Sequence, residues 1–125
     1  MNKPARRILV VDDEKHIRES LVVGLNDYGW NVESACDGAA AMVYDAAFDA
    51  YVIDLGLPDD DGVELAYKLA KPFGDVPIII LSGFYTQKDA ADACPKPVSQ
   101  FVKKPFKFDE LDQILTNLTT RRKEV

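Results

Sequence analysis

The sequence predicts an α/β fold built around a parallel β-sheet. Five short runs favour β-strands: "RRILVV" at 6–11, "NVESA" at 31–35, "AYVIDL" at 50–55, "VPIIILS" at 76–82 and "SQFVKK" at 99–104. The first, third and fourth are nearly continuous apolar runs, which are typical of parallel strands whose two faces are both covered. Helix-like segments alternate with these runs, and five strand-helix units predict an α/β sandwich. The chain of 125 residues is long enough for one domain, 1–125.

Apolar residues at helical spacing define the helices between and after the strands. The stripe of the first helix consists of Ile17, Leu21, Leu25 and Tyr28. The same spacing recurs at Val63, Ala66, Tyr67 and Ala70, and again at Leu111, Ile114, Leu115 and Leu118. Acids suited to the helix dipole lie in the first turns: Glu14, Glu64, Asp109 and Glu110. Lys107 lies where a capping Ser, Thr or Asp is usual, which predicts a weak start for the last helix.

Composition narrows the classes of function. The net charge of −6 and the pI near 4.7 argue against binding of nucleic acid or an anionic membrane by this domain. No apolar run reaches the length of a membrane span, and the opening residues do not show the pattern of a signal peptide, so we expect none. Cys36 and Cys94 show no motif spacing, so we expect free thiols in a reducing compartment and a cytoplasmic location. His16 has no metal-ligand companion, and we expect it on the surface of a helix.

Polar residues lie at the carboxyl ends of four of the five predicted strands. They are Asp12, Asp13, Asp54, Ser82 and Lys104. Each alone has an ordinary interpretation, as a helix cap, a turn former or a solvated charge. Parallel strands all end at one rim of the sheet, however, and such rims bind ligands. We therefore expect these five side chains to share one site.

This set of residues has a shared chemical logic. Carboxylates brought close together repel one another unless a cation lies among them. Oxygen ligands of this kind suit Mg²⁺, which also takes phosphate oxygens. A hydroxyl and a lysine would complete a phosphate site, and a carboxylate there can be the nucleophile that accepts a phosphoryl group.

With these residues in view, the sequence resembles a response-regulator receiver domain, the phosphoryl-accepting part of two-component signalling. The resemblance rests on "ILVVDDE", "DLGLPDDDG", "IIILSG" and "FVKKPF", in this order and at these spacings, over nearly the whole chain. It implies a flavodoxin-like fold with strand order 2-1-3-4-5, one of the common orders of doubly wound parallel sheets. It also implies Mg²⁺ as cofactor and a switching function rather than an enzyme's turnover.

The resemblance assigns a role to each matching position. Asp54 is the phosphoryl acceptor, while Asp12, Asp13, Asp54 and the backbone carbonyl of Gly56 hold Mg²⁺. Ser82 is the switch hydroxyl and Phe101 the switch aromatic. Lys104 contacts the phosphate, and it is chosen over Lys103 because it directly precedes Pro105, whose peptide bond is implied to be cis.

The resemblance also implies partners. A sensor histidine kinase or a histidine phosphotransfer protein supplies the phosphoryl group. The switched state controls an output domain or a downstream protein, and a homodimer through the fourth helix, fifth strand and fifth helix is one form of that face. Two features depart from the common pattern: Phe101 replaces the frequent Tyr, and Pro95 and Pro97 predict that the fourth helix ends by about Ala93.

Three alternatives stay open at this point. A Mg²⁺-dependent phosphohydrolase of the haloacid-dehalogenase type would need a second Asp at position 56, which is Gly. A flavin or nucleotide binder would need a Gly-rich or Ser/Thr-rich phosphate loop after the first strand, where "VDDEKH" is acidic instead. A degenerate receiver that serves only as an interaction module would not need the complete set of site residues.

Overall fold

A computed structural model of the chain describes residues 6–44, 48–54, 68, 76–82 and 100–124. At residues 54, 82, 101 and 121–124 it describes the backbone alone. Several expectations lie outside the described residues: the helical stripe and first-turn acid at 63–70, the end of the fourth helix near Ala93, the backbone carbonyl of Gly56 and the thiol of Cys94.

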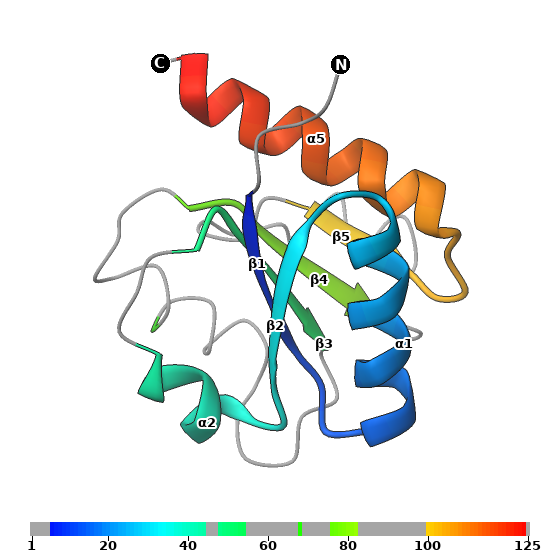
Figure 1. Cartoon of the computed structure of the whole chain (residues 1–125), viewed down its shortest axis with the longest axis vertical. Helices are drawn as coiled ribbons and strands as arrows, with labels where there is room; N and C mark the ends of the chain where they lie inside the picture. Colours follow the sequence, from blue (N-terminus) through cyan, green and yellow to red (C-terminus); the bar gives the residue numbers. More distant parts are fainter. Residues whose placement is uncertain (1–5, 45–47, 55–67, 69–75, 83–99, 125) are drawn as a thin grey trace.

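Five parallel strands form one sheet in the order β2-β1-β3-β4-β5 (Figure 1). The strands are β1 (Arg7–Val11), β2 (Asn31–Ala35), β3 (Ala50–Asp54), β4 (Ile78–Ser82) and β5 (Gln100–Lys103). The expected parallel sheet and its strand order are thereby confirmed. Each strand lies within its predicted run, with the ends shifted by no more than two residues.

Helices cover both faces of the sheet, which explains the continuous apolar runs. On one face, α1 (Lys15–Asp27) and α5 (Phe108–Glu124) pack on the side of β1 that carries Ile8 and Val10. On the other face, α2 (Gly38–Val43) packs on the side that carries Leu9 and Val11 (Figure 1). Because successive side chains of a strand point to opposite faces, every residue of such a strand is apolar.

The end of α1 is tied to β2 and to α5. Gly29, with φ of +98°, allows the Trp30 N–H to donate to the Leu25 carbonyl at 3.2 Å and closes the helix in a Schellman motif. The Trp30 indole N–H then donates to a carboxylate oxygen of Asp112 in α5, at 2.8 Å. A second contact joins α1 and α5: the Phe108 ring lies so close to Gly24 that a Cβ atom on residue 24 would be 2.4 Å from the ring. The two helices on this face are therefore held in one arrangement.

The predicted stripe of α1 is correct in its centre and wrong at its ends. Leu21 and Leu25 are buried, but Ile17 and Tyr28 are 42% and 40% exposed. Tyr28 lies beyond the last helical residue, and Ile17 lies in the first turn, past the carboxyl end of β1. Glu14 is the residue before the helix rather than part of its first turn.

Other expectations for the helices hold. Leu111 and Leu115 are fully buried, and the partly buried Ile114 and Leu118 pack against the core cluster to which these two belong. The first turn of α5 contains the acids Asp109 and Glu110. Lys107 directly precedes this helix, and His16 is exposed on α1.

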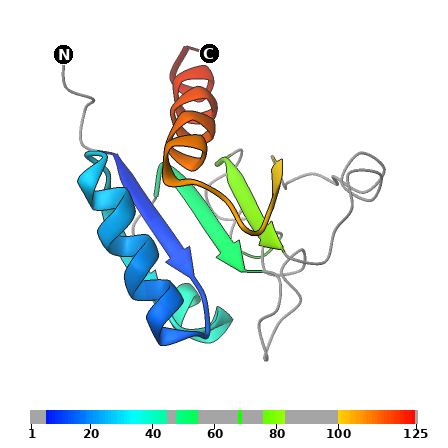
Figure 2. The same cartoon turned by 90° about the vertical axis from the view of Figure 1, so that its right-hand side faces the viewer.

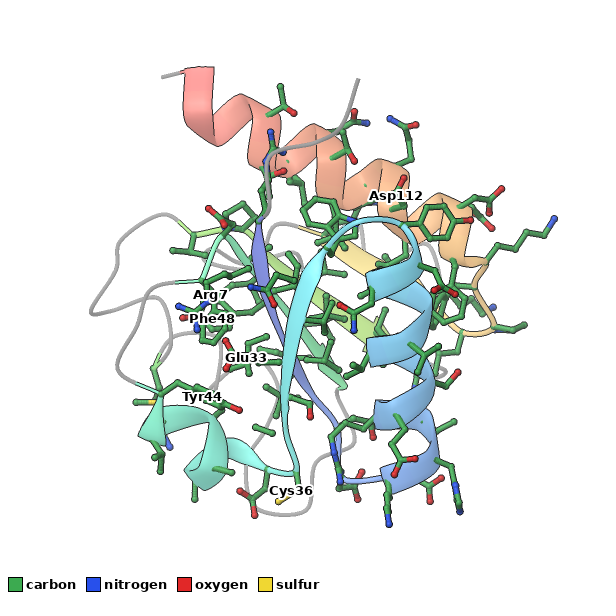
Figure 3. The ribbon with its side chains drawn as sticks, viewed as in Figure 1. Arg7, Glu33, Cys36, Tyr44, Phe48 and Asp112 are labelled. Atoms are coloured by element: carbon green, nitrogen blue, oxygen red, sulfur yellow. The ribbon has the colours of Figure 1, made fainter. Side chains whose placement is uncertain are left out.

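A brace of contacts from Arg7 links the amino end of β1 to β2 and to the residue before β3. The Arg7 guanidinium donates to the Glu33 carboxylate of β2 and lies over the Phe48 ring, 4.6 Å from its centre (Figure 3). The Arg7 backbone N–H also donates to the Asp49 carboxylate at 2.8 Å, just before β3. Arg7 thus contacts the neighbours of β1 on both sides, which favours the observed register. A shift of one residue would turn every side chain of the strand to the wrong face.

Candidate functional site

The carboxyl ends of the parallel strands meet at the end of the sheet opposite this brace. The arrowheads of β1, β3 and β4 all point to that end (Figure 2). Asp12 and Asp13 directly follow β1, Asp54 and Ser82 are the last residues of β3 and β4, and Lys104 directly follows β5. The backbone therefore brings all five candidate residues to one rim, as expected for an α/β ligand site.

Asp12 and Asp54 lie at the same level on neighbouring strands. Val11 pairs with Ile53, and the two aspartates are the next residue of each strand. Neighbouring strands lie about 4.8 Å apart, so the register places the two acidic positions side by side. Only the backbone of Asp54 is described, and the pairing rests on that backbone.

The hydroxyl and lysine positions continue the rim on the other side of β3. Asp54 pairs with Leu81, so Ser82 lies one residue further along the next strand. Ser82 in turn pairs with Lys103, which places Lys104 one residue further again. From β3 to β4, and again from β4 to β5, the candidate residue thus lies one position further along its strand. Ser82 therefore lies further out at the rim than Asp54, and Lys104 lies further out again.

Exposure separates the two lysines at this rim. The Lys103 side chain is exposed, whereas Lys104 is half-buried. The peptide bond between Lys104 and Pro105 is cis, as the resemblance implied. The lower exposure of Lys104 agrees with its expected position in the site, which stays a prediction.

Asp12 is held rigidly at the end of β1. Its side chain is 0% exposed, and its Oδ1 accepts a hydrogen bond from the Glu14 N–H at 2.9 Å. Its own N–H donates to the Ala35 carbonyl of β2 at 3.1 Å. The Arg18 guanidinium donates to its backbone carbonyl at 2.8 Å. Asp13, by contrast, is exposed.

The donor chemistry of the rim fits Mg²⁺. A buried carboxylate, an exposed neighbour and a third acid at the adjacent strand end offer oxygen ligands, which Mg²⁺ prefers. Within the described side chains, no three His, Cys, Asp or Glu residues gather as a metal site. Asp12 and Asp13 are the two expected ligands with described side chains, so this count is too small to test the full set.

Arg18 belongs to the surroundings of this site and was not predicted from the sequence. A cation one turn into a surface helix has the ordinary interpretation of a solvated charge, and its contact depends on where the helix begins. The available signal was its spacing, since it lies six residues after Asp12. The backbone N–H of Glu14 was missed for a similar reason, because every residue but proline carries such a donor.

No helix in the described part of the chain is both long and apolar enough to cross a membrane.

Comparison with curated proteins identifies relatives along nearly the whole chain. The response regulator MprA of Mycobacterium avium (strain 104) is 34% identical over 119 residues, which cover 94% of this chain and 52% of that protein. MprA of Mycobacterium tuberculosis (strain ATCC 25618 / H37Rv) has the same identity and coverage. The chain thus spans about half the length of these relatives.

Solved structures of similar fold are also response regulators or their receiver domains. The receiver domain of the Francisella response regulator 1452 has a TM-score of 0.84 and 28% identity, covering 94% of this chain and 98% of that one. The response regulator TrrA of Thermotoga maritima, in complex with Mg²⁺–BeF, has a TM-score of 0.79 and 32% identity, covering 90% and 98%. The chemotaxis response regulator CheY4 of Vibrio cholerae has a TM-score of 0.81 and 25% identity, covering 92% and 99%.

The model of the response regulator receiver domain family matches residues 8–116. This match includes four of the five strands in full, all but the first residue of β1, and every candidate residue of the rim. The chain therefore belongs to the family of response regulator receiver domains, which are signalling modules of two-component phosphorelays rather than classical enzymes.

Proposed function

We propose that Asp54 accepts a phosphoryl group from a histidine kinase or a histidine phosphotransfer protein, in a reaction that needs Mg²⁺. The observation that carries the proposal is the register that places Asp54 level with the buried Asp12 on the neighbouring strand. Membership of the receiver family itself implies a histidine kinase partner. TrrA, which is similar in structure, was solved with Mg²⁺–BeF.

The proposed step forms a bond between a carboxylate oxygen of Asp54 and phosphorus. The phosphorus–nitrogen bond of the phosphohistidine breaks, and its electron pair leaves with the imidazole. Bound Mg²⁺ would supply positive charge against the carboxylates and the phosphate oxygens. Asp12, Asp13, Asp54 and the Gly56 carbonyl would hold the metal. Lys104 would bind a phosphate oxygen, and its half-buried position strengthens that attraction relative to a fully solvated amine.

The switch and its output complete the proposal. A hydrogen bond from the Ser82 hydroxyl to the phosphate would favour one of two states, with Phe101 moving inward in the same state. The output is either a further domain, as the length of the relatives suggests, or a separate protein. A homodimer through the expected fourth helix, β5 and α5 is one form of that output. The expected cytoplasmic location belongs to the same proposal.

Phosphorylation of the purified chain tests the central step. Acetyl phosphate should modify the protein in the presence of Mg²⁺ and leave it unmodified in EDTA, as seen on a phosphate-retarding gel and by intact mass. Peptide mapping should place the modification at Asp54. Modification that is equally fast in EDTA, or that maps to another residue, would refute the proposal.

A pair of adjacent lysines tests the assignment of the cation. Lys104→Ala should slow the acceptance of the phosphoryl group by about tenfold to a thousandfold, because a charge-assisted contact to the transferring group is lost. Lys103→Ala removes the same charge from an exposed side chain and should stay within about twofold of the wild type, since exposed charges are screened. The rates are compared by gel at saturating Mg²⁺. A larger effect at Lys103 would mean that the wrong lysine has been assigned.

A further inference from the structure

Arg18 connects the first helix to the acid pair at the rim. It lies one turn into α1, it is half-buried, and its Nη1 donates to the backbone carbonyl of Asp12 at 2.8 Å. The described bond goes to the main chain and not to a carboxylate. A guanidinium that donates to the carbonyl at the end of a strand often contributes to stability alone. Here the carbonyl lies between two acids of the candidate site, which indicates a second role for Arg18.

The bonded carbonyl belongs to the peptide unit that joins the two acids. A peptide unit is planar, so the Asp12 carbonyl, the Asp13 N–H and both Cα atoms move together. The bond from Arg18 therefore restrains Asp12 and Asp13 at the same time. The Glu14 N–H donates to Asp12 Oδ1, and the Asp12 N–H donates to the Ala35 carbonyl. Together with the bond from Arg18, these contacts hold the acid pair from α1, from the turn before α1 and from β2.

We propose that Arg18 is a positioning residue that holds Asp12 and Asp13 in the arrangement that binds Mg²⁺. This inference rests on the metal site of the proposed function. Its effect reaches the metal through the acid pair, with no contact between Arg18 and the phosphoryl group.

Two effects of Arg18 on Mg²⁺ binding have opposite signs. As a positive charge it repels the cation, and its removal would then tighten binding. As a support of the ligands it favours binding, and loss of such a support typically weakens metal affinity by about 10–100-fold. Arg18 is partly solvated, so water weakens its repulsion of the cation, whereas its hydrogen bond acts directly on the peptide unit that carries the ligands. We therefore expect the support to outweigh the repulsion.

Titration of the purified chain with Mg²⁺ alone, monitored by calorimetry, shows directly whether Arg18 strengthens or weakens Mg²⁺ binding. Arg18→Met keeps the length and the apolar stem but removes the donor, and it should raise the Kd for Mg²⁺ about tenfold. Arg18→Lys keeps a cationic donor and should stay within about threefold of the wild type. Lys15→Met is the matched control, because it removes a charge near the start of the same helix, at a side chain that is 73% exposed and pairs with Glu19.

The outcomes separate this inference from the proposed function. A Kd for Arg18→Met that is unchanged or tighter overturns the positioning role, and so does an equal loss of affinity in Lys15→Met or no rescue by Arg18→Lys. If the wild type itself does not bind Mg²⁺, the metal site of the proposed function fails instead, and the Arg18 role fails with it. Melting curves in EDTA confirm that each variant is folded, and Arg18→Ala, which also removes the donor, replaces Arg18→Met if that variant is not.

Discussion

Asp54→Asn should abolish acceptance of the phosphoryl group, with a fall in rate of at least about a thousandfold. The asparagine amide has nearly the same shape as the carboxylate, but its oxygen carries no charge and is a poor nucleophile. The strand itself should be unaffected, because Val52 and Ile53 beside it supply the buried apolar contacts. The loss is measured as the absence of a retarded band on a phosphate-retarding gel after incubation with acetyl phosphate and Mg²⁺.

A nearby acid provides the control for this substitution. Asp60→Asn makes the same chemical change six residues later in the "DLGLPDDDG" segment and should leave phosphorylation within about twofold of the wild type. Equal modification of Asp54→Asn and the wild type would show that another residue is the acceptor. If both variants lose phosphorylation, the effect comes from the total charge of the segment and not from one nucleophile.

The fold could be predicted from the sequence because each strand carries its own signal. The run at residues 8–11 is apolar at every position and fully buried, as is typical of a strand covered on both faces. Once the strands were known to be parallel, Asp12 and Asp54 had to share a rim, because topology alone brings the ends of such strands together. That they are level with each other required the register, in which Val11 pairs with Ile53.

The parts that could not be predicted depend on where elements begin and end. Ile17 and Tyr28 have the correct helical spacing, but the sheet ends before the first and the helix ends before the second, so both are exposed. Arg18 is a similar case, since its bond to the Asp12 carbonyl exists only because α1 begins at Lys15, close to the end of β1. Periodicity reports which face of a helix is apolar, and it carries no information on how far that face is covered.

Asp12→Asn should be more stable than the wild type in EDTA and less stable than the wild type in Mg²⁺. The wild type buries the Asp12 carboxylate at 0% exposure beside the Asp54 position, and a negative charge there is costly without a metal. Asparagine removes the charge and keeps an oxygen that can accept the Glu14 N–H. In EDTA we therefore expect the variant to be more stable than the wild type, by roughly 1–2 kcal/mol in the free energy of unfolding.

Mg²⁺ should then favour the wild type. A ligand that binds only the folded state adds about 2.7 kcal/mol of stability at a hundred times its Kd, and the variant has lost a ligand of that site. The order of the two proteins should thus be opposite in EDTA and in Mg²⁺, as measured by urea unfolding under both conditions. Asp13→Asn is the matched control: its side chain is exposed, so it should lose the response to Mg²⁺ with little gain in EDTA. A variant Asp12→Asn that is less stable than the wild type in EDTA, or that Mg²⁺ stabilises to the same extent, would contradict a charged metal ligand at this position.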